Sequence, residues 1–305
     1  MSPIFPEFKL VSVEDNEVIE THNRKFPYYS DYNFPSLVCW DIHKHREWSL
    51  LNDNLVVKFT DYETEEPFFS YLGMNDTLGT TRTLLDYSES IGLPAELRLM
   101  PEISIHDIHA DDLEIIPDRD NFDYVYLTSR MATLEGNQYK SKRQAANFFK
   151  RNHPGWTFEV FPLGDIRVQE VIRSIALSWK SRRDIDPDDQ SIEHEACAIE
   201  NIFKLAEVRD LLVGVLFVDG VPTSFTIEEI VNQIFSMGHF WKTANRVDGE
   251  YEFLASKMAA YLDTKEVTYL NWEQDLGIQT LRASKSSYRP SDFLKKFIVT
   301  RRQIS

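Results

Sequence analysis

Short apolar runs and amphipathic stretches alternate along the chain, and each predicts a strand or a helix. Residues 47–51 and 55–60 are apolar runs on either side of Asn52-Asp53-Asn54, residue types that tolerate the left-handed turn conformation, so they predict a hairpin. Asp219-Gly220 marks a second hairpin in the later half of the chain. Amphipathic helices are predicted near residues 77–91, 165–180, 192–208 and 251–262.

The order of the predicted elements repeats. Three strands, a helix, a strand, a helix and a final strand occur around residues 47–127 and again around 211–301, although the two halves share negligible sequence identity. Strands and helices mixed in this order predict an α+β fold with a mixed sheet in each half. We therefore predict two fused domains, one at residues 1–127 and one at 128–305.

Composition and charge narrow the class of protein. The 305 residues are 42% hydrophobic and 13% aromatic, enough for a substantial core, and the net charge of −16 argues against a generic nucleic-acid binder. Cys39 and Cys197 lie far apart, and His43 and His45 have no further predictable ligands, so no metal site is predicted. The sequence has no visible signal peptide, and its longest apolar run, about 211–218, has only a strand's length. We expect a soluble, cytoplasmic protein.

One segment carries the opposite charge to the rest of the chain. Residues 130–156 contain six bases and one acid, whereas the remainder holds 27 of the 33 bases and 48 of the 49 acids. Within it, a basic helix at 138–151 is interleaved with aromatic residues, a pattern typical of contacts to a phosphate backbone and to stacked bases. An amphipathic helix with its cations in solvent explains the same pattern. The candidate nucleic-acid contacts are Lys140, Lys142, Arg143, Lys150 and Arg151.

A strand-to-helix corner between residues 271 and 290 gathers polar side chains of both signs. A predicted strand at 267–270 enters a turn punctuated by Gly277, and a helix follows. In open α/β sheets, ligands usually bind beyond the carboxyl end of a strand, so this corner is a candidate site. A salt-bridged turn that holds a C-terminal helix is the alternative. The residues concerned are Asn271, Glu273, Asp275, Arg282, Lys285 and Tyr288.

The repeated element order resembles that of GCN5-related N-acetyltransferase (GNAT) domains. In those domains the loop after the fourth strand carries the pattern Gln/Arg-x-x-Gly-x-Gly/Ala and binds the donor pyrophosphate. The corresponding stretch here, "RVDGEY", supplies Arg246 and Gly249 but places Tyr251 at the last position. Free amides at a helix N-terminus bind phosphate, and glycine lets the backbone approach it, whereas Tyr251 would crowd coenzyme A. An ordinary helix-capping turn remains the alternative.

Several separated motifs resemble the soluble relatives of the phosphatidylglycerol lysyltransferase C-terminal domain. They occur in order over roughly residues 20–300 and include "YSDYNFPSLVCW", "EGNQYKSKRQAANFFKRN", "HFWKTANRVDGEYEFL" and "NWEQDLGIQTLRASKSSYRP". The resemblance implies two fused GNAT-like folds, related to the Fem-type peptidoglycan aminoacyltransferases, in which aminoacyl-tRNA donates its aminoacyl group to an amine or hydroxyl. Membrane members act on phosphatidylglycerol and carry an N-terminal multi-span region that this sequence lacks, so the acceptor, a small molecule or a lipid headgroup, stays open.

The resemblance also implies roles for the residues already singled out. Aminoacyl-tRNA would be a co-substrate bound by the basic helix, with no permanently bound cofactor. Lys242 or Lys285 would stabilise the oxyanion, and Glu273 or Tyr288 would act as acid or base. Substrate-binding candidates are Arg246, Gly249, Tyr251, Asn271, Asp275 and Arg282. An acyl-coenzyme A N-acyltransferase and a non-catalytic binding module with the same fold are the alternatives.

Overall fold

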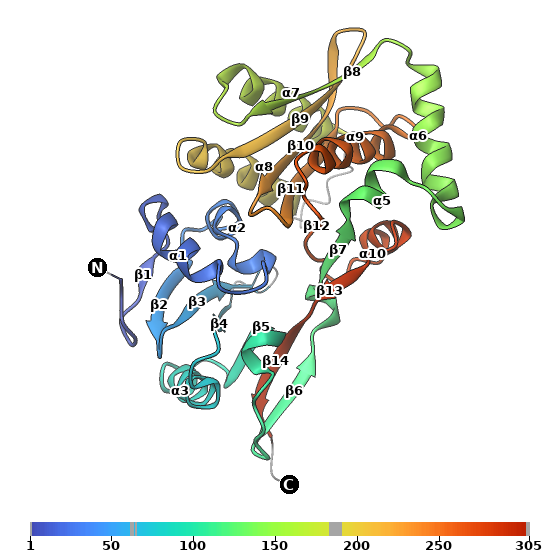
Figure 1. Ribbon diagram of the computed structural model, residues 1–305. Coiled ribbons are helices and arrows are strands. Elements are labelled where there is room, and N and C mark those ends of the chain that lie inside the picture. Colours follow the sequence, from blue (N-terminus) through green and yellow to red (C-terminus); the bar gives the residue numbers. More distant parts are fainter. Residues whose placement is uncertain (1, 62–63, 65, 183–190, 303–305) are drawn as a thin grey trace. The chain divides into compact units, whose positions relative to one another are not determined.

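The computed structural model describes residues 2–61, 64, 66–182 and 191–302, and the chain divides into two compact units (Figure 1). The first unit comprises Met1–Asp123, Gln274–Ile278 and Leu294–Ser305, and the second comprises Tyr124–Glu273 and Gln279–Phe293. Each unit is built on a seven-stranded mixed sheet. The predicted α+β class, with a mixed sheet in each of two units, is confirmed.

The first sheet has the strand order β1-β2-β3-β4-β5-β14-β6, and all neighbouring strands are antiparallel except β4 and β5. Figure 1 shows the C-terminal strand β14 running between β5 and β6. The core of this unit includes Val56, Leu85 and Val299, which are fully buried. Its elements are β1 (Lys9–Leu10), α1 (Asn16–Asn23), α2 (Phe34–Cys39), β2 (Glu47–Leu51), β3 (Asn54–Thr60), β4 (Pro67–Leu72), α3 (Thr77–Ser90), β5 (Glu96–Pro101), α4 (Glu102–Ile105), β6 (Leu113–Pro117) and β14 (Lys296–Arg301).

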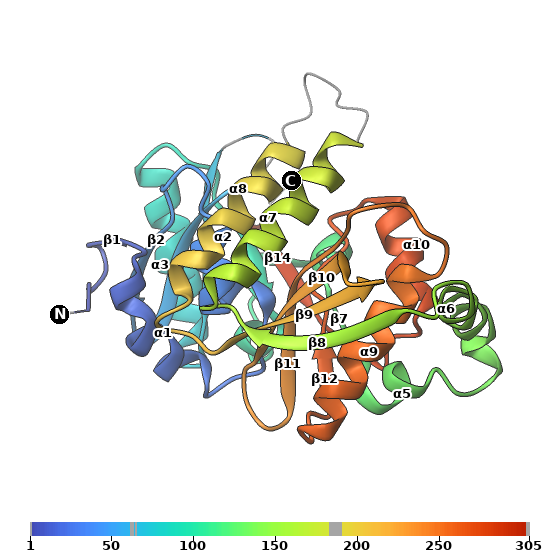
Figure 2. The same ribbon diagram turned by 90° about the horizontal axis from the view of Figure 1, so that it is seen from above.

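The second sheet has the order β8-β9-β10-β11-β12-β7-β13, and β11 and β12 are parallel. Helices α7 and α8 run side by side, and α9 packs against α5 and α6 (Figure 2). Its elements are β7 (Asp123–Leu127), α5 (Thr128–Thr133), α6 (Lys140–Asn152), β8 (Trp156–Pro162), α7 (Ile166–Ser181), α8 (Ser191–Ile202), β9 (Leu211–Val218), β10 (Val221–Ile230), β11 (Phe235–Thr243), α9 (Glu250–Thr264), β12 (Tyr269–Asn271), α10 (Gln279–Ser287) and β13 (Asp292–Leu294).

Both sheets follow one plan, and in each the sixth strand comes from the other half of the chain. That strand is β14 in the first sheet and β7 in the second. The sequence-based division is therefore corrected at its end: residues 294–305 were assigned to the second domain, but they belong to the first unit. The physical reason is that β14 forms antiparallel ladders with β5 and β6, which bury Val299 in the core of the first unit.

Four strands of the described chain have no counterpart among the predicted elements, and they are the edge strands of the two sheets, β1, β6, β8 and β13. The acidic segment at 107–123 reads as a solvated linker, yet it contains β6, and β8 begins at the end of the basic segment. Strands β6 and β8 are edge strands with many exposed positions, so neither produces a clear apolar run. The prediction failed because edge strands carry polar side chains that protect the sheet from further pairing.

Candidate functional site

The parallel strands β11 and β12 in the second unit separate at their carboxyl ends. Their pairing stops at Met237 and Asn271, whereas β11 continues to Thr243 and remains paired with β10. The residues that follow, 238–241 on β11 and Trp272 and Glu273 after β12, therefore border a split in the sheet. At such a split, main-chain and side-chain groups lack the neighbouring strand that a continuous sheet would provide. Ligands commonly bind at such places.

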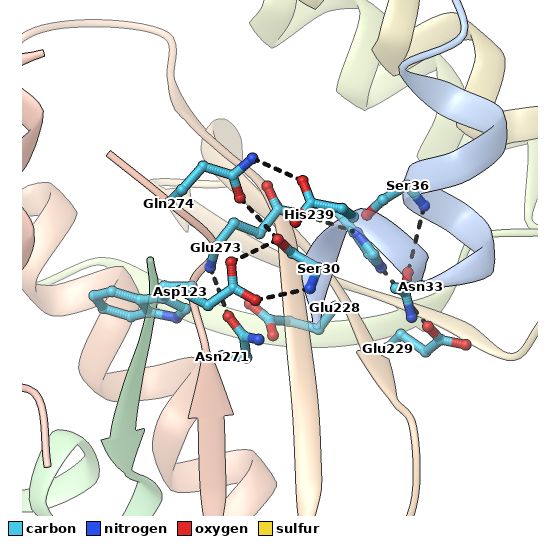
Figure 3. Close-up of polar contacts among 12 residues, drawn as sticks. Ser30, Asn33, Ser36, Asp123, Glu228, Glu229, His239, Asn271, Glu273 and Gln274 are labelled. Carbon is cyan, nitrogen blue, oxygen red and sulfur yellow. Dashed lines mark hydrogen bonds and ion pairs between the residues drawn. The ribbon is translucent and has the colours of Figure 1, made fainter. Parts of the chain in front are cut away.

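A β-bulge directs His239 toward this split. The register between β10 and β11 shifts so that Ile227 pairs with Phe240 and Glu228 pairs with Gly238, which leaves His239 as the extra residue. The His239 side chain is buried, with Nδ1 3.6 Å from Glu273 Oε1 (Figure 3). Its other ring nitrogen, Nε2, lies 3.9 Å from Glu229 Oε2. The imidazole therefore stands between two carboxylates.

Glu228 is the most deeply buried acid of the group. Thr226 donates a hydrogen bond of 2.9 Å to one carboxylate oxygen, and Ser236 donates one of 3.1 Å to the other. Burial raises the pKa of Glu228 to about 7, against the opposing effects of these hydroxyl groups and of His239. This carboxyl group therefore keeps its proton to a higher pH than an exposed glutamate does.

Gly238 allows Glu228 and two indole rings to approach one another. A Cβ atom on Gly238 would lie 3.0 Å from Glu228 Oε1, from Trp241 Nε1 and from Trp272 Cδ1. Since all three atoms lie 3.0 Å from one point, no two of them are more than about 6 Å apart, and any side chain at position 238 would force them outward.

Several buried polar atoms around the split lack a hydrogen-bond partner. They are both ring nitrogens of His239, the indole nitrogens of Trp241 and Trp272 and the hydroxyl oxygen of Tyr288, none of which has a hydrogen bond to a described residue. Trp272 packs edge-on against Trp241 and Tyr288, with ring centroids 5.0 and 5.2 Å apart. Each unsatisfied buried group costs about 1–3 kcal/mol, so their concentration in one region points to a polar ligand.

The charges of the site are mainly negative. Three glutamates, Glu228, Glu229 and Glu273, lie around His239, and Arg209 forms an ion pair with one of them, Glu229. Asn271 is fully buried and its Oδ1 accepts a hydrogen bond of 2.8 Å from the amide of Glu273, which has a φ of 54°. Among the residues that the structure describes, no group of three or more His, Cys, Asp or Glu side chains has an arrangement that could hold a metal ion.

The two predicted oxyanion-stabilising lysines are engaged within the second unit. Lys242 pairs with Glu195 and lies over the Trp179 ring, with Nζ 4.4 Å from its centroid. Lys285 donates a hydrogen bond to the carbonyl of Trp272, so it braces the chain beside the split. Of the other candidates in this corner, Tyr288 is buried, which raises its pKa well above the usual value, and Arg282 is half-buried on α10.

Helix α6 covers the N-terminus of α9, where a GNAT domain binds pyrophosphate. Gly249, the N-cap of α9, has a φ of 80°, and a Cβ there would lie only 1.9 Å from the carbonyl oxygen of Ala145. The first turn also carries Glu250, which is buried, and Glu252. Carboxylates at this helix end occupy the positive end of the dipole and disfavour an anionic ligand.

The other two residues of the predicted phosphate loop lie at different depths. Arg246 is exposed, whereas the ring of Tyr251 packs 5.9 Å from that of Trp241. Burial raises the pKa of Tyr251 above its usual value, so this hydroxyl stays protonated near neutral pH. Tyr251 thus belongs to the aromatic cluster below the split.

The cations of α6 fall into two groups. Lys142 forms an ion pair of 3.1 Å with Glu252, and Arg143 donates to the carbonyls of Leu134 and Gly136. These two hold α6 to its neighbours. Lys140, Lys150 and Arg151 are exposed, as is Phe148, so they form the part of the helix that is accessible to a partner.

Asp275 belongs to the first unit and is not brought to the split. Its side chain is fully buried, 3.3 Å from Arg119, and accepts a hydrogen bond of 3.0 Å from the amide of Gly277. These contacts brace the turn at 274–278, so the salt-bridged turn expected as the alternative applies to this residue.

A second buried polar cluster in the first unit is centred on Lys296. Its Nζ pairs with Asp31 and with Asp123, the latter at 2.7 Å, and donates to Ser30 Oγ at 3.1 Å. Burial acts to lower the pKa of Lys296, but the two carboxylates outweigh it and raise the pKa above its usual value. Ser30 also hydrogen-bonds to Gln274 at 2.8 Å (Figure 3). Every charge here is paired, so we assign this cluster to stability.

The sequence analysis missed Glu228, Glu229, His239 and Arg209. The signal that existed was the pair Glu228-Glu229 inside an otherwise apolar strand segment, since adjacent acids in a central strand are rarely buried without a reason. The bulge at His239 leaves no mark in the sequence, because it depends on the register of two strands.

Comparisons with known proteins agree on the family. The family model described as phosphatidylglycerol lysyltransferase, C-terminal, matches residues 24–300. Among curated proteins, no sequence matches the chain. Within the described part of the chain, every helix is too short or too polar to cross a membrane.

Solved structures cover nearly the whole chain. A conserved protein of unknown function from Bacteroides thetaiotaomicron VPI-5482 is 25% identical, with a TM-score of 0.85, and the match covers 99% of this chain and 100% of that one. The C-terminal domain of a putative lysylphosphatidylglycerol synthetase from Agrobacterium fabrum is 12% identical, with a TM-score of 0.63 and coverage of 94% and 92%. L-PGS from Bacillus licheniformis is 13% identical, with a TM-score of 0.61 and coverage of 95% and 93%.

Proposed function

We propose that the chain, which belongs to the phosphatidylglycerol lysyltransferase C-terminal domain family, transfers an aminoacyl group from aminoacyl-tRNA to an amine or hydroxyl acceptor. The split between β11 and β12 is the proposed reaction site. The observation that carries the proposal is the set of buried acids and unpartnered polar atoms gathered there. An aminoacyl ester combines a cationic amine with a polar carbonyl, and this environment offers partners for both.

The charge of the site favours a cationic aminoacyl group. Glu273 and Glu229 lie on either side of His239, which also interacts electrostatically with Glu228, whereas Arg209 neutralises the Glu229 carboxylate. An ammonium group entering this region gains charge-assisted hydrogen bonds from acids that are already desolvated. We assign Glu273 and Asn271 to the binding of the amine, with Asn271 holding the backbone of Glu273 in place.

The covered terminus of α9 favours tRNA over coenzyme A as the donor carrier. A pyrophosphate at Gly249 would meet the carbonyl of Ala145, and Glu250 and Glu252 add negative charge. In the first unit, the corresponding helix α3 is capped by the Asp76 side chain, which accepts a hydrogen bond from the amide of Gly79 at 3.2 Å. Neither helix end resembles an open anion site.

The exposed cations of α6 provide the test of the tRNA donor. We expect Lys140→Ala/Lys150→Ala/Arg151→Ala to weaken tRNA binding by about tenfold or more and to reduce the salt dependence of binding, since each phosphate contact releases counterions. Filter binding across a salt series measures both. Arg167→Ala is the matched control, because Arg167 is an 83% exposed base on α7 of the same unit.

Equal tRNA affinity for the triple variant and the wild type, or binding without any salt dependence, would remove tRNA as the donor carrier. The structure also argues against testing Lys142 and Arg143 first. Both residues hold α6 in place, so their loss changes the fold of this region as well as its charge.

A second candidate is a non-catalytic module, and one observation favours it. Trp272, beside the corner at 271–290, is surrounded by the rings of Tyr126, Trp241 and Tyr288, with centroids about 5 Å away. Such packing fills space that a substrate would need. A protein that binds tRNA but never deacylates or transfers the aminoacyl group, with any amine or hydroxyl acceptor offered, would support this candidate.

A further inference from the structure

Glu228 is a fully buried acid that forms no ion pair with a lysine or arginine among the described residues. Glu229 is paired with Arg209, and Glu195 is paired with Lys242. Glu228 instead accepts hydrogen bonds from two neutral hydroxyl groups, those of Thr226 and Ser236, and it is fully buried. Such a carboxyl group can take up and release a proton without breaking an ion pair.

Two hydrogen-bond donors without partners stand beside this carboxyl group. Trp241 Nε1 and the Trp272 ring lie at the same 3.0 Å distance from the Cβ position of Gly238 as Glu228 Oε1 does. Neither indole N–H is satisfied by any residue in the described ranges. An acid–base group next to unused N–H donors is the arrangement that acyl transfer requires, because the reaction moves a proton and builds negative charge on a carbonyl oxygen.

We propose that Glu228 is the general base and acid of the transfer and that the indole N–H groups of Trp241 and Trp272 bind the acyl carbonyl oxygen. This inference rests on the proposed function. The acceptor nitrogen or oxygen attacks the ester carbonyl carbon as its proton passes to the Glu228 carboxylate. The negative charge on the carbonyl oxygen is held by the indole N–H groups. The bond from the carbonyl carbon to the tRNA ribose oxygen then breaks, and that oxygen receives the proton from Glu228.

The pKa of Glu228 suits this role, since a group near neutrality can both accept and return a proton. The titratable groups that face it are His239 on β11, Glu273 after β12 and Tyr251 on α9. The positive form of His239 would lower the pKa of Glu228, and the Glu273 carboxylate raises it. We therefore expect the transfer rate to rise with pH through about 7 and then level off, as the attacking base must be ionised.

The first test measures transfer from tRNA charged with a labelled amino-acid mixture to hydroxylamine, above the enzyme-free rate, across pH. We expect Glu228→Gln to lower the single-turnover rate by about 10²–10⁴-fold and to abolish the pH dependence. Glu250→Gln is the matched control, because Glu250 is also a buried glutamate with a raised pKa but lies at the start of α9. The transfer rate and pH profile of Glu250→Gln should match those of the wild type. An unchanged rate in Glu228→Gln alongside an active wild type overturns the inference but leaves the proposed function standing.

The second test needs no tRNA. It tests whether the indole N–H groups bind a carbonyl oxygen, even if the first test detects no transfer. Lysinamide presents an amine and a carbonyl, and its binding is followed by calorimetry and by the change in tryptophan fluorescence. We expect millimolar or tighter binding to the wild type and at least about tenfold weaker binding to Trp241→Phe, which loses one hydrogen bond. Trp48→Phe, at a buried tryptophan of the first unit, should bind as the wild type does. No binding by the wild type, or equal binding by Trp241→Phe, overturns the inference, whatever the outcome with tRNA.

Discussion

At the scale of single residues, the chain buries charge in two different ways. Around Lys296, two carboxylates and a hydroxyl satisfy the ammonium group, so the cluster is complete. Around Glu228, the acid has neutral partners and unsatisfied donors beside it. A cluster whose polar groups are all satisfied stabilises one arrangement of the fold. A cluster with unsatisfied donors can gain hydrogen bonds when a ligand binds. This contrast is why we assign stability to the first and chemistry to the second.

The stabilising role of the Lys296 cluster can be tested, because the adjacent Lys295 provides a matched control. Lys296→Met leaves Asp123 buried without its cation and should destabilise the first unit by about 3–5 kcal/mol. Lys295→Met removes an ion pair with Glu102 whose side chains are 47% and 45% exposed, and it should cost little. Hydrogen exchange at the amides of β5 and β14 measures both.

The effect of Lys296→Met should not vary with pH near neutrality. The pKa of Lys296 is raised in the folded protein, so its contribution is complete below the unfolded value of 10.5 and is lost only as pH rises through the folded value. Equal protection in the two lysine variants would contradict the assignment of this cluster to stability.

At the scale of elements, the junction of α6 and α9 is where this unit departs from a GNAT domain that binds coenzyme A. The helix that carries the accessible cations also closes the terminus where phosphates would sit, and the Lys142–Glu252 ion pair ties the two helices together. Under the proposed function, the same helix both covers the terminus of α9 and carries the cations that would contact tRNA. The proposed choice of donor therefore depends on the position of α6.

Gly249 tests this junction, and Gly220 provides the control. Both glycines have a φ near 80°, so alanine strains the backbone equally at each, by about 1–2 kcal/mol. A Cβ at Gly220 meets nothing within 4 Å, whereas one at Gly249 would lie 1.9 Å from Ala145 O. Gly249→Ala should therefore cost clearly more than Gly220→Ala and should loosen α6 in hydrogen exchange. Matching losses of stability would mean that α6 does not press on this terminus.

Most elements were predictable because they have strong local patterns. The hairpin at Asp219-Gly220 follows from turn chemistry and the helix near 77–91 from its amphipathic pattern, and both occur in the structure. The candidate site was predictable only in part, since residues 271–288 form one contiguous motif. Glu228 and His239 join it through the β10–β11 register and its bulge, which no local pattern encodes.

At the scale of the whole molecule, the exchange of strands is the feature that local patterns cannot reveal. β7 and β14 occupy the same place in the two sheets, and each comes from the half of the chain that forms the other sheet. The sequence correctly predicts that β7 and β14 are strands. It does not predict which strands they pair with, because that depends on contacts between residues distant in sequence. The first unit consequently contains both ends of the described chain and is finished only when the last strand has been made.

Because β14 comes from the end of the chain, the stability of a fragment that ends at the predicted boundary, residue 127, can be predicted. Residues 1–127 alone lack β14, and with it Lys296 and the buried Val299, so β5 and β6 lose the strand between them. We expect this fragment to be without cooperative unfolding or slow hydrogen exchange in β5. A peptide of residues 274–302, added in excess, should restore protection, because binding to the folded form alone stabilises it by mass action.

The same peptide with Val299→Asp is the control for the fragment experiment. It keeps the length and nearly the whole sequence but places a charge in the core position of β14. Restoration by the unaltered peptide only would establish that β14 completes the first unit through its specific packing. A fragment of residues 1–127 that folds cooperatively by itself would refute the dependence, and it would then follow that β14 merely extends a sheet that is already stable.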